Sequence, residues 1–327
     1  MSIRVGLVGT GYAAKVRAEA FQSDPRSHLV AVTGHEPKNT ATFAQSYGAA
    51  TVSDWPRLID RTDLDLIVVS TVNALHGPIV QAALEADLAV VVEYPLCLDF
   101  GQAARLVELA AKQQQFLHVE HIELLGGLHQ AMQGAIAQVG TPTYASYRTL
   151  NPQHPAPAKW TYHPALFGFP LIAALSRIHR LVNLFGPVET VSCQSRFDPA
   201  TEQAEPYYGT CLCSARLQFR SGLIAEVTYG KGEHLWQYSR RIEVQGSRGS
   251  LVFDRDEGQL TTATGTTPVE VAPRRGLFVQ DTAAVLDALT EGSSLYVSAE
   301  ESLYALKVAE AARQSASSGQ TIGLDAV

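Results

Sequence analysis

Residues 3–125 alternate short apolar runs with segments of helical periodicity. The apolar runs lie at residues 3–9, 28–34, 64–71, 88–95 and 116–125, and helical segments lie at 13–22, 39–48, 77–87 and 100–115. An apolar run without polar alternation is typical of a strand whose two faces are both covered by helices. The repeated strand–helix–strand order predicts right-handed βαβ units and a doubly wound parallel sheet.

The pattern changes from residue 124 onward. Helices are predicted at 126–139, 171–185, 281–292 and 299–316, and strands at 187–197, 210–222, 223–233, 240–253 and 259–264. Strands that follow one another without helices between them predict a mostly antiparallel sheet with helices on one face. The Pro-rich residues 151–160 are predicted to form a loop near the site. A chain of 327 residues exceeds one ordinary core, so we expect two domains, 1–123 and 124–327.

The composition is that of a globular protein, with 46% hydrophobic and 17% charged residues. A net charge of −7 gives no support for nucleic-acid binding, which requires a clustered basic face. No apolar run approaches the ~20 residues that a membrane helix needs. The N-terminus enters a predicted strand almost at once, so we expect no signal peptide and a cytoplasmic location.

The four cysteines are Cys97, Cys193, Cys211 and Cys213, and none of them forms a C-x-x-C pair. Zinc ligands in structural sites usually come with such spacing, so we expect no metal site. Free cysteines that pack in a core are typical of a reducing compartment.

A glycine-rich turn directly follows the first apolar run. It consists of Gly9, Thr10, Gly11, Tyr12, Ala13 and Ala14, in the pattern G-x-G-x-x-A. Gly9 permits a tight turn, Gly11 lets a pyrophosphate approach the backbone, and Ala14 allows a helix to pack closely on a strand. Because a predicted strand precedes the turn and a predicted helix follows it, we expect the turn to bind a dinucleotide. A purely structural glycine turn is the alternative.

Residues 34–38 indicate which dinucleotide is preferred. NAD-specific proteins place an acid at the tip of the second strand, where the acid holds the ribose hydroxyls. Here Gly34 occupies the strand end, and His35 and Lys38 follow. The missing carboxylate leaves room for a 2′-phosphate, with which His35 or Lys38 can pair, so we expect NADPH to be preferred over NADH. Under the alternative, Glu36 takes the role of the acid.

The glycine turn and residues 70–96 resemble the glucose–fructose oxidoreductase/inositol dehydrogenase (Gfo/Idh/MocA) family. Its third strand ends in a sequence like A-T-P-N-x-x-H, and a later strand ends in Glu-Lys-Pro. Matching positions here are Thr71, Asn73, His76, Glu93 and Pro95. The resemblance implies a Rossmann domain followed by an α+β domain, with Thr71, Asn73, His76 and Glu93 at the cofactor.

The chain departs from this family at both of its proton-handling positions. Tyr94 replaces the lysine of Glu-Lys-Pro. The family also carries an Asp-x-x-x-His-type motif in its second domain, and Ile172 and Ser176 occupy those two positions. Alcohol oxidation needs a base whose pKa lies near the working pH, and an unperturbed tyrosine has a pKa of about 10. A sugar dehydrogenase is therefore disfavoured.

The remaining motifs resemble the biliverdin reductase branch of the family, and most closely its cyanobacterial type. They are "EYP", "HVEHIELLGG", "KWTYH", the block from "FGFP" to "SRIHRLVNLFG", and "AEVTYGKGE". The resemblance implies that NADPH reduces the central C10 methine bridge of biliverdin IXα and yields bilirubin. A conjugated methine carbon accepts hydride directly, so no hydroxyl has to be deprotonated and the missing lysine and histidine do no harm.

Two residues are candidates for the catalytic step. Arg177 follows Ser176 on the helix that faces the nicotinamide in the family, and we expect it to stabilise negative charge that develops on the tetrapyrrole. A salt bridge to the Rossmann domain is the alternative role. Tyr94 is expected to form a wall of the pocket and to position the substrate by stacking, with proton donation or plain packing as alternatives.

Three further residues are candidates for binding the substrate. In the predicted strand 116–125, His121 lies near the carboxyl end and shares a face with Glu123, and a structural histidine is the alternative. Arg180 shares a helix face with Arg177, either in a surface pair or as a clamp for a propionate. Lys231, between two glycines, is the preferred partner of a propionate, and Lys159, Arg274 and Arg275 remain open.

Two other functions remain open. The same fold could reduce or oxidise a sugar or another carbonyl compound, or it could bind NADP as a sensor without turnover. Missing acid–base residues favour a sensor, whereas the specific motifs favour the reductase. We expect a monomer rather than an oligomer.

Overall fold

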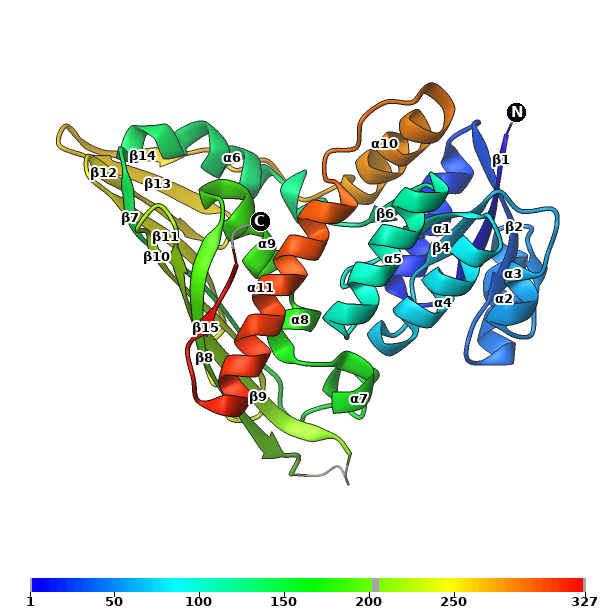
Figure 1. The fold of residues 1–327 in the computed structure, drawn as a ribbon, viewed down its shortest axis with the longest axis horizontal. Coiled ribbons are helices and arrows are strands. Elements are labelled where there is room, and N and C mark those ends of the chain that lie inside the picture. The colour runs from blue at the N-terminus through cyan, green and yellow to red at the C-terminus, as the bar shows by residue number, and fades with distance from the viewer. Residues whose placement is uncertain (1, 202–205, 326–327) are drawn as a thin grey trace. The chain divides into compact units, whose positions relative to one another are not determined.

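The computed structural model describes residues 2–201 and 206–325, and two compact units divide the chain (Figure 1). The first unit comprises Met1–Leu125 and Gly276–Leu303, and the second comprises Gly126–Arg275 and Tyr304–Val327. The boundary at residue 303 falls inside the helix α11 (Ala299–Ser318).

A six-stranded sheet in the order β3-β2-β1-β4-β5-β6 lies at the centre of the first unit. All its pairings are parallel, as predicted, and the order is that of a doubly wound dinucleotide-binding fold. Its strands are β1 (Ile3–Val8), β2 (Ser27–Thr33), β3 (Ala50–Thr51), β4 (Leu66–Val69), β5 (Ala89–Val92) and β6 (Leu117–Val119). Its helices are α1 (Tyr12–Ser23), α2 (Pro37–Ser46), α3 (Trp55–Ile59), α4 (Asn73–Glu85), α5 (Phe100–Gln113) and α10 (Leu277–Glu291), with a 3₁₀ helix at Ile122–Leu124.

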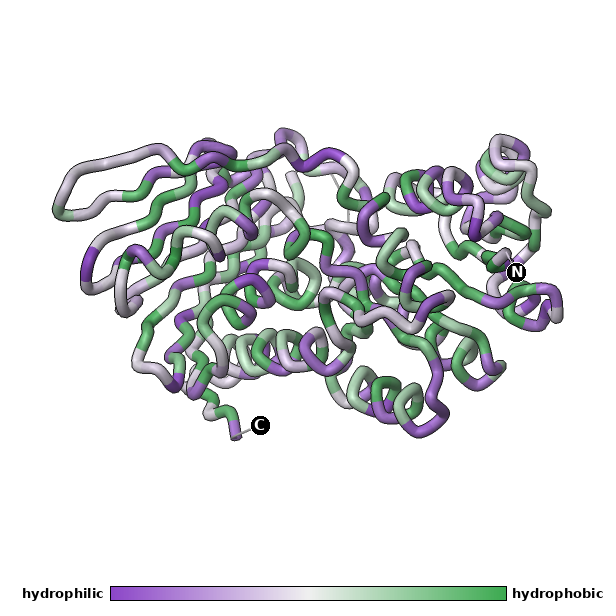
Figure 2. The backbone as a smooth tube through the Cα atoms, turned by 90° about the horizontal axis from the view of Figure 1, so that it is seen from above, coloured by the Kyte–Doolittle hydropathy of each residue, from purple (hydrophilic) through white to green (hydrophobic). Residues whose placement is uncertain are grey.

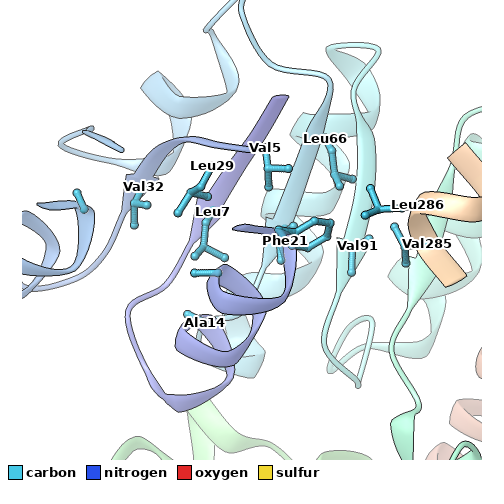
Figure 3. Packing of buried hydrophobic residues seen from close by; sticks show 13 residues of the cluster. Val5, Leu7, Ala14, Phe21, Leu29, Val32, Leu66, Val91, Val285 and Leu286 are labelled. Carbon is cyan, nitrogen blue, oxygen red and sulfur yellow. The ribbon is translucent and has the colours of Figure 1, made fainter. Parts of the chain in front are cut away.

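The core of the first unit includes a helix from late in the chain. Figure 3 shows Val285 and Leu286 of α10 beside Val91 of β5, near Phe21 of α1. All four side chains are buried. The predicted boundary assigned residues 276–303 to the second domain. The structure places them in the first unit, because α10 covers apolar surface of the sheet that α1 leaves exposed.

A nine-stranded sheet in the order β14-β13-β12-β11-β7-β10-β9-β8-β15 forms the second unit. It is antiparallel except where β7 and β10 pair in parallel, so the predicted fold class is confirmed. Its strands are β7 (Pro142–Pro152), β8 (Val188–Pro199), β9 (Tyr208–Phe219), β10 (Ile224–Gly232), β11 (Ser239–Gly246), β12 (Gly249–Asp254), β13 (Glu257–Thr262), β14 (Gly265–Val269) and β15 (Ile322–Gly323). Its helices are α6 (Gly127–Ala135), α7 (Pro164–Phe167), α8 (Pro170–Ala173) and α9 (Ser176–Phe185), with 3₁₀ helices at Ile136–Val139 and Trp160–Tyr162.

The strand β7 lies in the middle of this sheet, although the sequence analysis did not predict it. Its buried side chains are Ala145, Tyr147 and Thr149, and polar or half-exposed residues alternate with them. Figure 2 shows the corresponding change between green and paler or purple segments along the strands of this unit. Because its buried residues include small and polar ones, the hydrophobic alternation along β7 is weak. The strand is buried because other strands pair with it on both sides.

Two predicted elements are wrong in their extent. The helix predicted at 171–185 is divided into α8 and α9, because Ala174 leaves the helical conformation at φ −102° and ψ 35°. The strand predicted at 116–125 ends at Val119, and the Glu120 side chain accepts the backbone N–H of Ile122 as the chain turns. His121 therefore does not alternate with Glu120 on a strand.

In the described part of the chain, no helix is both long and apolar enough to cross a membrane.

Candidate active site

The glycine turn between β1 and α1 has the geometry that the motif predicts. Gly9 has φ +123°, and a Cβ at this position would lie 2.0 Å from the carbonyl oxygen of Ser70. A Cβ added to Gly11, the N-cap of α1, would meet no atom within 4 Å. The backbone N–H groups at the start of α1 therefore face open space, where they can hold an anionic group.

The end of β2 exposes the two predicted partners of a 2′-phosphate. The side chain of His35 is 98% exposed, and Lys38 is also exposed. Gly34 itself is closely packed. A Cβ there would lie 2.7 Å from Thr40 Oγ1 and 2.8 Å from Thr10 Cγ2. Gly34 is thus needed for close packing inside the turn.

His76 joins the ends of two neighbouring strands. Its Nδ1 lies 2.8 Å from the carbonyl oxygen of Pro95 and its Nε2 lies 3.3 Å from that of Thr71. Burial lowers the pKa of His76 despite these two carbonyls, so the neutral ring donates to only one of them. Asn73, at the start of α4, is also buried. The geometry of His76 supports a role in positioning the strand ends.

Tyr94 rests on a buried histidine. Its ring lies parallel to that of His121, with 5.3 Å between the centroids and 5° between the planes. His121 Nε2 lies 2.8 Å from Ser302 Oγ, and the His121 side chain is buried. The structure therefore places His121 behind Tyr94, where it fixes the orientation of the tyrosine ring.

A network of buried charges lies under the end of β5, and the sequence analysis missed it. Arg17 of α1 is fully buried, donates from Nε to Glu93 over 2.8 Å, and donates from Nη1 to Asp281 of α10. Asp281 also contacts His118 at 2.8 Å and accepts a hydrogen bond of 2.6 Å from Tyr296. The sequence feature that could have revealed this network is an arginine on the apolar face of α1.

The charges in this network stabilise one another. Burial by itself would lower the pKa of Arg17, but the charges of Asp281 and Glu93 raise it. Burial would raise the pKa of Asp281, but Arg17 and His118 lower it. Both residues therefore stay charged inside the protein, and together they hold Glu93 at the sheet edge.

Arg177 stands at the start of α9 in the second unit. Its Nη1 donates to Ser176 Oγ over 3.0 Å, and its guanidinium carbon lies 5.2 Å from the ring centroid of Tyr229. The Arg177 side chain is half-buried, so part of it stays accessible. A tethered, partly accessible cation has the properties that electrostatic stabilisation requires.

Arg180 does not lie on the surface, as one of its two predicted roles required. Its side chain is buried, and its guanidinium carbon lies 5.7 Å from the ring centroid of Tyr147. Arg180 lies three positions after Arg177, but its burial excludes a solvent-exposed pair at this position. Nearby His179 is also buried, and burial lowers its pKa to about 4.

Lys231, which the sequence favours as the partner of a propionate, is buried. It donates to the carbonyl of Thr161, and its Nζ lies 3.5 Å from the ring centroid of Phe167 and 4.6 Å from that of Tyr162. Burial lowers the pKa of Lys231 to about 8. The geometry supports a structural role, with the ammonium group stabilised by ring faces.

Replacing Lys231 with Met should remove a pH dependence of stability. The pKa of about 8 in the folded state lies below the ordinary lysine value of 10.5, so the unfolded chain binds more protons between these values and stability rises with pH. From pH 7.5 to 9.5, wild-type protein should gain about 2 kcal/mol relative to Lys231→Met. Urea unfolding at both pH values measures this difference, and parallel curves for the two proteins would contradict it.

In residues 2–201 and 206–325, no group of three or more His, Cys, Asp or Glu side chains is arranged to hold a metal ion. Comparison with known proteins identifies the family.

The model for the NAD-binding Rossmann fold of one oxidoreductase family matches residues 3–121, and the model for its C-terminal alpha/beta domain matches residues 133–324. The chain belongs to the GFO/IDH/MocA oxidoreductase family. The resemblance that residues 70–96 suggested is thereby confirmed.

Individual relatives include several activities. The crystal structure of biliverdin reductase from Synechocystis sp. PCC 6803, in complex with biliverdin and NADP+, has a TM-score of 0.93 and 49% identity, and the match covers 96% of this chain and 99% of that one. Mouse biliverdin reductase A is 28% identical over 58% of this chain and 60% of its own. A dTDP-3,4-didehydro-2,6-dideoxy-alpha-D-glucose 3-reductase from Saccharopolyspora spinosa is 27% identical over 77% of this chain and 75% of its own.

Proposed function

We propose that this oxidoreductase uses NADPH to reduce the C10 methine bridge of biliverdin IXα, which yields bilirubin. The observation that carries this proposal is the likeness, at 49% identity, to the Synechocystis enzyme in complex with biliverdin and NADP+. The residues agree with the chemistry. Tyr94 stands where the family has a lysine, and Ile172 and Ser176 stand where it has an acid and a histidine.

The cofactor site of this proposal lies at the carboxyl ends of β1, β2, β4 and β5. Gly11, with Thr10, Tyr12 and Ala13, would hold the pyrophosphate, and Thr71 and Glu93 would contact the nicotinamide end of the cofactor. When bound, NADPH supplies the hydride. Buried Asn73 and His76 hold the ends of the strands in place for this contact.

On the substrate side, Tyr94 positions the tetrapyrrole by stacking and Arg177 stabilises the negative charge that develops on it. The rigid support of Tyr94 by His121 favours a positioning role for this tyrosine. We also propose that the enzyme is monomeric and cytoplasmic, as its sequence suggests.

Replacing His35 and Lys38 together with Ala should weaken the preference for NADPH. Both side chains are exposed next to the end of β2, where they can pair with a 2′-phosphate. We expect the Kd for NADPH to rise about tenfold, which corresponds to about 1.4 kcal/mol, whereas the Kd for NADH stays the same. Fluorescence titration measures both constants. Lys112→Ala, on the exposed end of α5, is the control, and an equal loss for both cofactors would contradict a role in 2′-phosphate binding.

The test of the proposed function is to mix the protein with NADPH and biliverdin and to record the visible spectrum. Conversion from green to yellow at the rate of NADPH consumption supports the proposal. Folded protein that binds NADPH but leaves biliverdin unchanged would refute it and would favour a sensor. Oxidation or reduction of a sugar nucleotide instead would assign the chain to the carbonyl-reducing branch of the family.

A further inference from the structure

Two carboxyl groups meet at the carboxyl ends of β5 and β6. The backbone N–H of Glu120 donates to the carbonyl of Val92 over 2.8 Å, which places Glu120 beside Glu93. The negative charge of Glu93 acts directly on the buried carboxyl group of Glu120. A carboxylate has only acceptor oxygens, so two neighbouring carboxyl groups can form a hydrogen bond with each other only when one of them carries a proton.

The surroundings place this proton on Glu120. Its side chain is 2% exposed, and burial and the charge of Glu93 raise its pKa well above the ordinary value. One of its oxygens accepts the N–H of Ile122, so the other oxygen is left to carry the proton toward Glu93. Glu93 is 16% exposed and accepts a hydrogen bond from Arg17, which stabilises its carboxylate form.

The other charged and titratable groups around the pair come from five parts of the first unit. They are Arg17 of α1, His76 of α4, Asp281 of α10, Tyr296 before α11 and His118 of β6. The single guanidinium of Arg17 already pairs with two carboxylates, those of Asp281 and Glu93. Among the described residues, Arg17 is the arginine that acts on Glu120, and its charge is already balanced, so the neutral form of Glu120 is favoured.

We propose that Glu120 is the proton store of the reaction and that its proton passes through Glu93 to the tetrapyrrole. This inference rests on the proposed function. The O–H bond of Glu120 breaks as its proton moves to the carboxylate of Glu93, and Glu93 passes this proton to a pyrrole-type nitrogen as the hydride forms the new C–H bond at C10. Glu93 is then a carboxylate again, and Glu120, left ionised, regains one proton from water.

Reduction therefore consumes one hydride and one proton, which yields NADP+ and bilirubin. A carboxylic acid suits this task only when its pKa lies close to the working pH, and an ordinary glutamate is ionised there. Glu120 is a positioning and proton-holding residue, because Glu93 separates it from the ligand.

Infrared spectroscopy tests the shared proton without any turnover. Wild-type protein at neutral pH should show the C=O stretch of a protonated carboxylic acid, with a shift in D2O, and Glu120→Gln should lack this band. Glu108→Gln, on the exposed face of α5, is the matched control and should keep the band. A band that persists in Glu120→Gln would overturn the inference, whether or not the protein reduces biliverdin.

Kinetics tests the delivery of the proton. The amide of Glu120→Gln still donates to Glu93 but has no proton to transfer, so single-turnover reduction should slow at least about tenfold with an unchanged Kd for NADPH. Reduction by the wild type should slow as the pH rises through the pKa of the pair, and the variant should lose this dependence. A wild-type rate and pH profile in the variant would overturn the inference. A hydrogen bond donated to Glu93, without a proton that can be transferred, would then be enough for reduction.

A second variant covers the case in which Glu120→Gln does not fold. Glu93→Gln removes the negative charge next to Glu120, so the infrared band of Glu120 should disappear at a lower pH than in the wild type. An unchanged titration would overturn the inference. Wild-type protein that does not reduce biliverdin would instead refute the proposed function, while the infrared result still decides whether the proton is shared.

Discussion

Replacing Arg17 with Met should lower the free energy of unfolding by about 3–5 kcal/mol, because it removes one partner from a fully buried ion pair. The carboxylate of Asp281 would remain inside the protein without its guanidinium, and Glu93 would lose its restraint. Methionine fills much of the same volume, so the missing charge rather than a cavity accounts for the loss. Urea unfolding followed by circular dichroism measures the difference.

Arg4→Met is the matched control for this substitution. Arg4 also pairs with an aspartate of the first unit, Asp65, but both side chains are about two-fifths exposed. Water and salt screen such a pair, so the midpoint of unfolding should hardly move. Equal destabilisation by Arg4→Met and Arg17→Met would contradict the prediction that burial makes the ion pair of Arg17 matter more for stability than that of Arg4.

A second large effect is expected at Arg177. Arg177→Ala should lower kcat for biliverdin reduction about 10²–10³-fold, as the loss of one group that stabilises developing charge does in other enzymes. The Kd for NADPH should change less than about twofold, because the cofactor motifs lie in the first unit. Stopped-flow reduction and fluorescence titration measure the two effects.

Two further variants show whether the charge of Arg177 is responsible. Arg177→Lys keeps a cation and should recover part of the lost kcat, although lysine lacks the planar fork of arginine. Arg216→Ala removes an exposed arginine of β9 and should leave both constants unchanged. An equal loss of kcat and NADPH affinity in Arg177→Ala would indicate a structural role instead.

The raised pKa of Glu120 and the lowered pKa of Lys231 have the same origin. Each group is buried, and burial disfavours its charged form. They differ in their neighbours, since Glu120 lies against a second carboxyl group and Lys231 against the faces of aromatic rings. The first arrangement stores a proton next to a predicted cofactor contact, whereas the second stabilises a loop that leads to α7.

Local sequence patterns predict the parallel sheet, the glycine turn and part of the candidate site. The apolar runs predict the parallel strands of the first unit, because burial on both faces leaves a continuous signal over a few neighbouring residues. The glycine turn is equally local, since the φ of +123° at Gly9 depends on one residue and its immediate partner, Ser70. Tyr94 and Ser176 are local as well, and their departure from the family pattern already argued against alcohol oxidation.

Which distant residues share an environment depends on how the chain folds back on itself. Arg17 and Asp281 are 264 positions apart, and the sequence gives no sign that α10 returns to the first unit. The burial of Arg180 and Lys231 depends on aromatic rings from other elements, so no local pattern around either residue predicted it. The proton on Glu120 has the same cause. Charge state follows from burial and from the charges nearby, and both are properties of the folded chain rather than of any segment.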